Sequence, residues 1–114
     1  MSAYVLALVN VKDREGYDQE FQPLARELLN AAGAEFLVGD DNPKVLMGET
    51  TNRVVITKFN DMTAVDNWSS GFNELWTSVG AKYADCTLIA VKGAMEGART
   101  EAAPVEGASA AAGR

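Results

Sequence analysis

The chain has 114 residues, 47% of them hydrophobic, and its 10 Lys and Arg against 16 Asp and Glu give a formal charge of -6. This length and apolar content suit one domain with one hydrophobic core. The acidic balance, with no basic cluster, argues against nucleic acid or an anionic membrane as a partner. No apolar stretch approaches the roughly 20 residues that span a bilayer, and the N-terminus lacks the features of a secretory signal. We therefore expect a soluble, cytoplasmic protein.

The first predicted strand, residues 4–11 (YVLALVNV), is uncharged and rich in Val and Leu. Apolar side chains fall on both of its alternate faces, which indicates that both faces are buried. Asp13 then suits the N-cap of a helix whose apolar residues recur every three or four positions until Gly33, a C-terminal stop signal. Pro23 lies inside this pattern, so we expect a kink or a helix that begins later than Asp13.

The middle of the chain predicts three more extended segments. Residues 34–39 (AEFLVG) form a strand, and the Asp and Asn residues at 40–43 suit a solvated turn better than a calcium loop. Residues 44–47 are predicted to return as a short strand. Residues 53–59 (RVVITKF) form a longer strand that again carries apolar side chains on both faces.

The last predicted elements are a helix and a strand. Asn60 or Asp61 caps a helix that is predicted to break near Gly71 and to resume with apolar residues at helical spacing. Residues 85–92 (DCTLIAVK) form the last strand. From Gly93 on, Ala and Gly dominate and large apolar residues are almost absent, so we predict a domain over residues 1–93 and a flexible tail over 94–114.

This order of elements is the split-βαβ pattern of a ferredoxin-like α+β fold, an antiparallel sheet with both helices on one face. The other face of such a sheet should be polar, yet the predicted strands are apolar on both sides. A second sheet is the simplest cover for that face. We therefore expect a homodimer that packs sheet against sheet, since closed two-fold symmetry is the commonest assembly.

Short motifs along the chain support a family assignment. Tyr4 to Gly93 resembles the domain-of-unknown-function 1330 family, in the dimeric α/β-barrel superfamily. The matching positions are Tyr4, Val11, Asp13, Tyr17, Gly33, Phe36-Leu37-Val38, Val45-Leu46-x-Gly48, Arg53-Val54-Val55, Phe59, Met62, Ala64 and Trp68. The chain departs from the family at Met47, where Glu is common, at Ser69, where Tyr is common, and in lacking an Arg on the last helix.

The residue types exclude several kinds of chemistry. The chain has no histidine, so Ser/His/Asp and Cys/His nucleophile systems, His-ligated haem and the usual catalytic zinc sites are ruled out. The single cysteine, Cys86, lies in an apolar run and is expected to be a buried, inert thiol. No phosphate-binding glycine loop is present. We expect neither a cofactor nor a metal.

The superfamily resemblance implies a cleft between sheet and helices that binds a small organic molecule. Candidate catalytic residues are the polar ones near strand ends: an amide that could orient a carbonyl, an arginine that could hold a carboxylate and three carboxylates that could act as a base. These are Asn10, Arg53, Glu35, Glu49 and Asp85. Tyr17, Trp68 and Trp76 are the candidate substrate-binding residues, although packing of helices on the sheet explains them equally well. For Asn10, a bond to nearby backbone is the alternative, for Arg53, a salt bridge, and for each of the three carboxylates, a solvated position at the sheet edge.

Three hypotheses follow from this set. The first is a cofactor-free acid/base enzyme, of isomerase or lyase type, acting on a small carbonyl or carboxylic compound. The second is a cofactor-independent monooxygenase of quinol-like substrates. The third is a non-catalytic small-molecule-binding or accessory protein, which the departures from the family pattern favour. The first suits a small dimer without a cofactor motif best.

Overall fold

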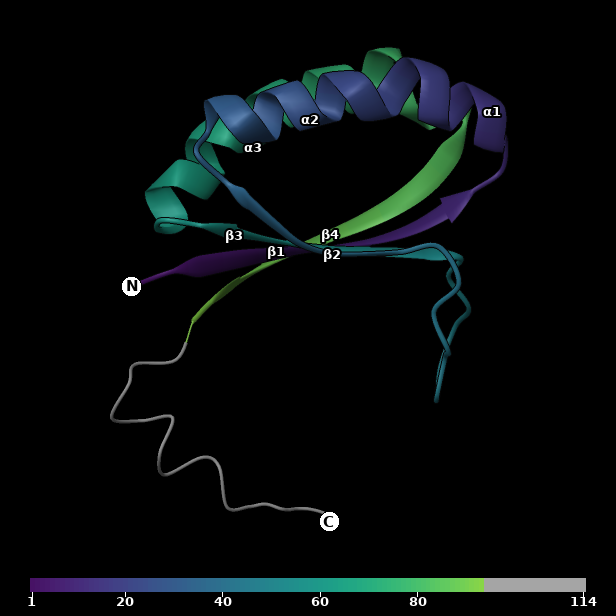
Figure 1. The fold of residues 1–114 in the computed structure, drawn as a ribbon, viewed down its shortest axis with the longest axis horizontal. Helices are drawn as coiled ribbons and strands as arrows, with labels where there is room; N and C mark the ends of the chain where they lie inside the picture. The colour runs from purple at the N-terminus through teal and green to yellow at the C-terminus, as the bar shows by residue number, and fades with distance from the viewer. Residues whose placement is uncertain (94–114) are drawn as a thin grey trace.

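The computed structural model describes residues 1–93. Within them, helices lie across one face of an antiparallel sheet with strand order β2-β3-β1-β4 (Figure 1). This arrangement confirms the predicted ferredoxin-like α+β fold, and the predicted tail lies outside the described residues. The elements are β1 (Ala3–Val11), α1 (Arg14–Gly16), the π-helical turn η1 (Tyr17–Phe21), α2 (Gln22–Ala31), β2 (Glu35–Asp40), β3 (Arg53–Phe59), α3 (Met62–Ser78), the 3-10 turn η2 (Gly80–Lys82) and β4 (Ala84–Lys92).

Strand β1 is central and aligns the others. It pairs with β3 on one side and β4 on the other, with Val9 opposite both Arg53 and Cys86. Alternation along the strands then places every second residue toward the helices. The core forms on that face, and its buried members are Ala3, Val5, Val9, Tyr17, Phe21, Phe59, Val65, Trp68 and Ala84.

The first helical region begins and ends where the sequence predicts. The Asp13 side chain accepts a hydrogen bond from the Gly16 backbone N–H, and Gly33 adopts a φ of 71°, the left-handed conformation that glycine tolerates. Pro23 lies in the first turn of α2, where a missing N–H costs little. The irregularity falls before it, as the π-helical turn Tyr17–Phe21.

Two predicted details are wrong. Helix α3 runs unbroken through Gly71, because one glycine costs only about 1 kcal/mol in a helix and the Trp68 and Phe72 rings beside it are packed 4.9 Å apart. Residues 44–47 form no strand but part of the loop between β2 and β3. The apolar side chains that suggested a strand there, Leu46 and Met47, are 84% and 93% exposed, so no burial holds the segment in a sheet.

The second face of the sheet carries apolar side chains, as predicted. In the described part of the chain no helix covers it, and the loop between β2 and β3 extends away on that side (Figure 1). Val38, Ile89 and Val91 are exposed there. No helix within residues 1–93 combines the length and apolar character needed to cross a membrane.

Candidate functional site

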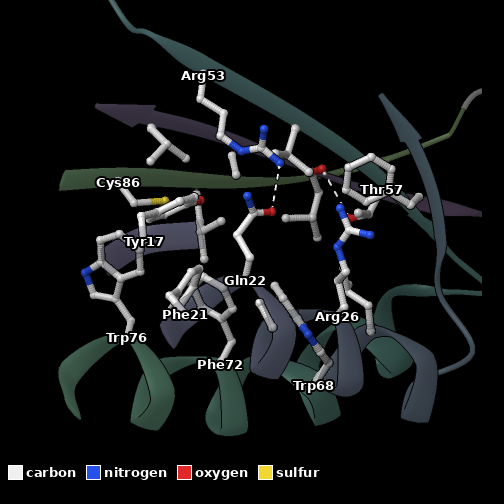
Figure 2. A pocket seen from close by; sticks show the side chains of 18 residues that line it. Tyr17, Phe21, Gln22, Arg26, Arg53, Thr57, Trp68, Phe72, Trp76 and Cys86 are labelled. Carbon is white, nitrogen blue, oxygen red and sulfur yellow. Dashed lines mark hydrogen bonds between the residues drawn. The ribbon is translucent and has the colours of Figure 1, made fainter. Parts of the chain in front are cut away.

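A cavity lies between the helix-covered face of the sheet and the helices (Figure 2). Its volume of about 60 Å³ is room for several water molecules. Small side chains leave this space, since Ala7 on β1 and Ala25 on α2 both line it. The lining is dominated by six aromatic residues: Tyr17, Phe21, Phe36, Trp68, Phe72 and Trp76.

The aromatic side chains form a connected row from η1 to the middle of α3. The Phe21 ring centroid lies 5.1 Å from that of Tyr17 and 5.2 Å from that of Trp76, edge-on to the indole. Phe72 continues the row, 4.9 Å from Trp68. These separations are those of favourable aromatic pairs, so the row forms a rigid apolar wall.

Arg53 brings a charge into this apolar space. It opens β3 opposite Val9, on the helix-facing side, and is only 5% exposed. Its Nη1 donates to Asp41 Oδ1 at 2.5 Å, and its Nη2 donates to Gln22 Oε1 at 3.2 Å. Figure 2 shows the guanidinium directed toward the Gln22 amide. Gln22 in turn donates through Nε2 to Asp18 at 2.8 Å.

Asp41 links Arg53 to the helical side of the molecule. Its Oδ1 also accepts from Nη2 of Arg14, which pairs with Asp18 at 3.3 Å as well. The pKa of Asp41 is lowered, first by the hydrogen bond from Arg14 and then by that from Arg53. Asp41 is therefore ionised at neutral pH and fixes the Arg53 guanidinium from outside the cavity.

Two buried donors of the cavity lining have no partner. Among the described residues, Arg53 Nε and Trp68 Nε1 are buried nitrogens without a hydrogen bond, and Trp68 is 8% exposed. Buried polar groups in proteins are usually paired. An unpaired donor that lines a cavity is therefore a place where a ligand acceptor would fit.

Two further titratable groups of the lining, Tyr17 and Cys86, are held neutral. Burial raises the pKa of Tyr17, and the nearby Arg53 charge only partly offsets this. Burial also raises the pKa of the Cys86 thiol to about 11. Both groups keep their protons at neutral pH, so neither supplies a base or a thiolate nucleophile.

Four of the predicted site residues meet in this cavity: Tyr17, Arg53, Trp68 and Trp76. The other four lie outside it and are exposed. Asn10 donates to the Thr50 carbonyl at 3.4 Å, and Asp85 pairs with Lys12 at 3.4 Å. Glu35 opens the edge strand β2 opposite Lys58, and Glu49 lies in the loop between β2 and β3.

Sequence reasoning missed Gln22, Arg26 and Phe36. Gln22 and Arg26 are one helical turn apart and directly follow Phe21 and Ala25 of the apolar stripe, which was a usable signal that they border the core. Phe36 had no such signal. Its ring lies across Gly39, where an added Cβ would approach it to 2.6 Å, and Arg26 lies 5.7 Å above it.

Comparison with known proteins places the fold in context. The crystal structure of RPA0582, a protein of unknown function from Rhodopseudomonas palustris, is similar with a TM-score of 0.64 at 16% identity, covering 82% of this chain and 83% of that one. The structure of methylated RPA0582 matches equally well, with 84% and 83% covered. A search of the curated proteins found no match. Residues 2–94 match the model of the family described as Domain of unknown function (DUF1330), so the chain belongs to that family.

Proposed function

We propose that this protein binds a small, mostly apolar organic molecule with a carbonyl or carboxylic group in the cavity between the sheet and the helices. The observation that carries the proposal is a buried arginine with a free donor in an otherwise aromatic cavity. Ligand sites are typically apolar hollows with a few fixed polar groups. Arg53 is such a group, and Asp41 and Gln22 fix its orientation.

Binding without proton abstraction suits this cavity best. An isomerase or lyase of the acid/base type needs a base within hydrogen-bond reach of the substrate. None of the described lining residues is Asp or Glu. Tyr17 and Cys86, which do line the cavity, hold their protons at neutral pH.

A pair of filling variants on α2 tests the binding site. Ala25→Leu inserts three carbon atoms into the cavity, whereas Ala31→Leu adds the same atoms at an exposed position. Native mass spectrometry of gently purified protein and thermal shift with a panel of small carbonyl and carboxylic compounds measure binding. We expect ligands for the wild type and for Ala31→Leu, and none for Ala25→Leu. Equal binding by both variants would place the ligand elsewhere and reject the proposal.

Proton exchange distinguishes binding from acid/base turnover. A bound carbonyl compound with an acidic α-hydrogen is incubated with the protein in D₂O and followed by proton NMR. We expect no deuterium uptake above the rate without protein. Enzyme-dependent uptake would instead support the isomerase or lyase hypothesis, and oxygen consumption with a phenolic compound would support the monooxygenase.

We also infer that the protein is a homodimer whose uncovered sheet faces pack together. The support is the row of apolar side chains on that face, of which Ile89 and Val91 are exposed at the edge strand, since soluble proteins seldom leave such patches open to water. Ile89→Glu should shift the mass measured by analytical ultracentrifugation from dimer to monomer. Thr77→Glu, exposed on the outer side of α3, serves as the control and should leave the dimer intact. A monomeric wild type contradicts the inference.

A further inference from the structure

The charge of the cavity lining is one-sided. Arg53 and Arg26 both line it, and no acidic residue among the described ones does. Asp41, the carboxylate that pairs with Arg53, lies behind the guanidinium and is shared with Arg14. Arg14 has a second carboxylate partner in Asp18, and both carboxylates lie outside the cavity lining. A ligand anion is favoured and a ligand cation is disfavoured at this site.

Within residues 1–93, the hydrogen bonds of Arg53 leave Nε as its one nitrogen without a partner. Nη1 is taken by Asp41 and Nη2 by Gln22, whereas Nε has no partner. A bidentate clamp through both Nη atoms would have to share them with Asp41 and Gln22. One carboxylate oxygen accepting from Nε would satisfy the donor without breaking the network that holds the side chain.

The second free donor belongs to Trp68, on the other side of the cavity. Its indole ring is packed against Phe59 at 5.1 Å and Phe72 at 4.9 Å, so the ring cannot turn freely to seek another partner. More than nine-tenths of each residue, Arg53 and Trp68, is buried. The aromatic side chains of Phe21 and Phe72 also line the cavity, and a flat ring would pack on them.

From these contacts we propose that the ligand is a small aromatic carboxylate with a second hydrogen-bond acceptor on its ring. The carboxylate accepts from Arg53 Nε, the ring packs on the aromatic row, and the second acceptor, a carbonyl or ether oxygen, accepts from Trp68 Nε1. This assignment rests on the proposed function and specifies the chemical class of its ligand. The cavity volume of about 60 Å³ is below the roughly 150 Å³ of a cavity that takes up benzene, so side chains of the lining must shift to admit one ring, and larger ligands are excluded.

Four probes separate the parts of this assignment by isothermal titration calorimetry on the full chain. They are 4-acetylbenzoate with both groups, benzoate with the carboxylate alone, acetophenone with the carbonyl alone, and benzylamine with a positive charge. We expect 4-acetylbenzoate to bind tightest, with benzoate and acetophenone each weaker by about tenfold or more, and no binding of benzylamine.

A tryptophan variant tests the second contact. Trp68→Phe keeps a packed ring but removes the free N–H, so it should weaken 4-acetylbenzoate about tenfold and leave benzoate unchanged. Thr77→Val is the control, since Thr77 is exposed and outside the cavity lining, and it should leave the affinities for both compounds unchanged. Arg53→Met should reduce 4-acetylbenzoate to the affinity of acetophenone.

Indole N–H resonances give a measurement that does not depend on variant stability. The chain has two tryptophans, so each resonance can be assigned, and 4-acetylbenzoate should move that of Trp68 more than that of Trp76. If acetophenone or benzylamine binds as tightly as the carboxylates, or if the Trp68 resonance stays in place, the ligand class is wrong while the binding function stands. If no compound of any class binds the wild type, the proposed function fails as well.

Discussion

Asp41→Asn should destabilise the protein, although Asp41 itself is half exposed. Asp41 is 52% exposed, but the Arg53 guanidinium that it neutralises is 6% exposed. Breaking a fully buried ion pair by removing one partner costs about 3–5 kcal/mol, because an uncompensated charge stays buried. Since Asp41 faces solvent on one side, which screens the interaction, we expect a smaller loss of about 1.5–3 kcal/mol in the free energy of unfolding.

Removing Arg53 instead should change the free energy of unfolding little. Arg53→Met takes away the buried charge together with the unpaired Nε, and an unsatisfied buried group carries a penalty of about 1–3 kcal/mol. This gain offsets the lost bonds to Asp41 and Gln22, and Asp41 keeps Arg14 as a partner. The net change should lie within about 1 kcal/mol of zero, as in buried ion pairs replaced by apolar residues.

A double-mutant cycle measures the interaction between Asp41 and Arg53. Urea unfolding of the wild type, both single variants and the double variant is followed at one protomer concentration, because dissociation of the proposed dimer would otherwise enter the result. The double variant should resemble Arg53→Met and not show the sum of the two losses. Asp18→Asn, which removes a carboxylate from the exposed Arg14, should cost at most about 1 kcal/mol. An Asp41→Asn loss no larger than that of Asp18→Asn would refute the view that Asp41 holds a buried charge.

Three further outcomes follow from the same structure. Because folding lowers the pKa of Asp41, the unfolded chain binds a proton at this carboxylate before the folded chain does. The stability that Asp41 contributes is therefore present at neutral pH and is lost as pH falls below about 4. Urea unfolding should show a smaller difference in the free energy of unfolding between wild type and Asp41→Asn at pH 3 than at pH 7. The Cys86 thiol, with its pKa raised to about 11, should react with iodoacetamide at pH 8 about 100-fold more slowly than in the urea-unfolded chain, and comparable rates would contradict its burial. Phe59→Ala, at a side chain that is 1% exposed, should cost about 3–5 kcal/mol by urea unfolding; Phe36→Ala, at an exposed position, should cost less than half of that, and equal losses would contradict the assigned core.

The fold was predictable because each signal is local. Short runs of apolar residues marked the strands, Asp13 and Asp61 marked helix starts, and Gly33 marked a helix end. The strand prediction for residues 44–47 was wrong because a run of apolar residues alone suggests a strand, whereas a strand forms only where the side chains gain burial. Gly71 misled in the opposite sense, since the packing of its neighbours in α3 outweighs its weak helix propensity.

The site was predictable in part, and there is a physical reason why some of its residues were predicted correctly and others were not. Arg53, Tyr17 and Trp68 were found because each interrupts or fits an apolar pattern on a face that packs. The carboxylates near strand ends were placed by sequence position alone, and strand ends lie at the rim of the sheet, where charged groups remain in water. The pairing of Asp41 with Arg53 joins a loop to a strand 12 residues away, and no local pattern predicts such a contact.

The cavity also departs from what stability alone would favour. Larger residues at Ala7 and Ala25 would fill the space, and an apolar residue at 53 would remove a buried charge and an unpaired donor. Compared with such replacements, Ala7, Ala25 and Arg53 each lower the free energy of unfolding. The surrounding aromatic packing and the Asp41 contact still hold the cavity in one geometry. Local departures from the rules of a well-packed core are expected at functional sites. Both unpaired buried polar atoms of the described residues are hydrogen-bond donors on side chains that line this aromatic cavity, and a ligand that supplies an acceptor is therefore the best explanation of the arrangement.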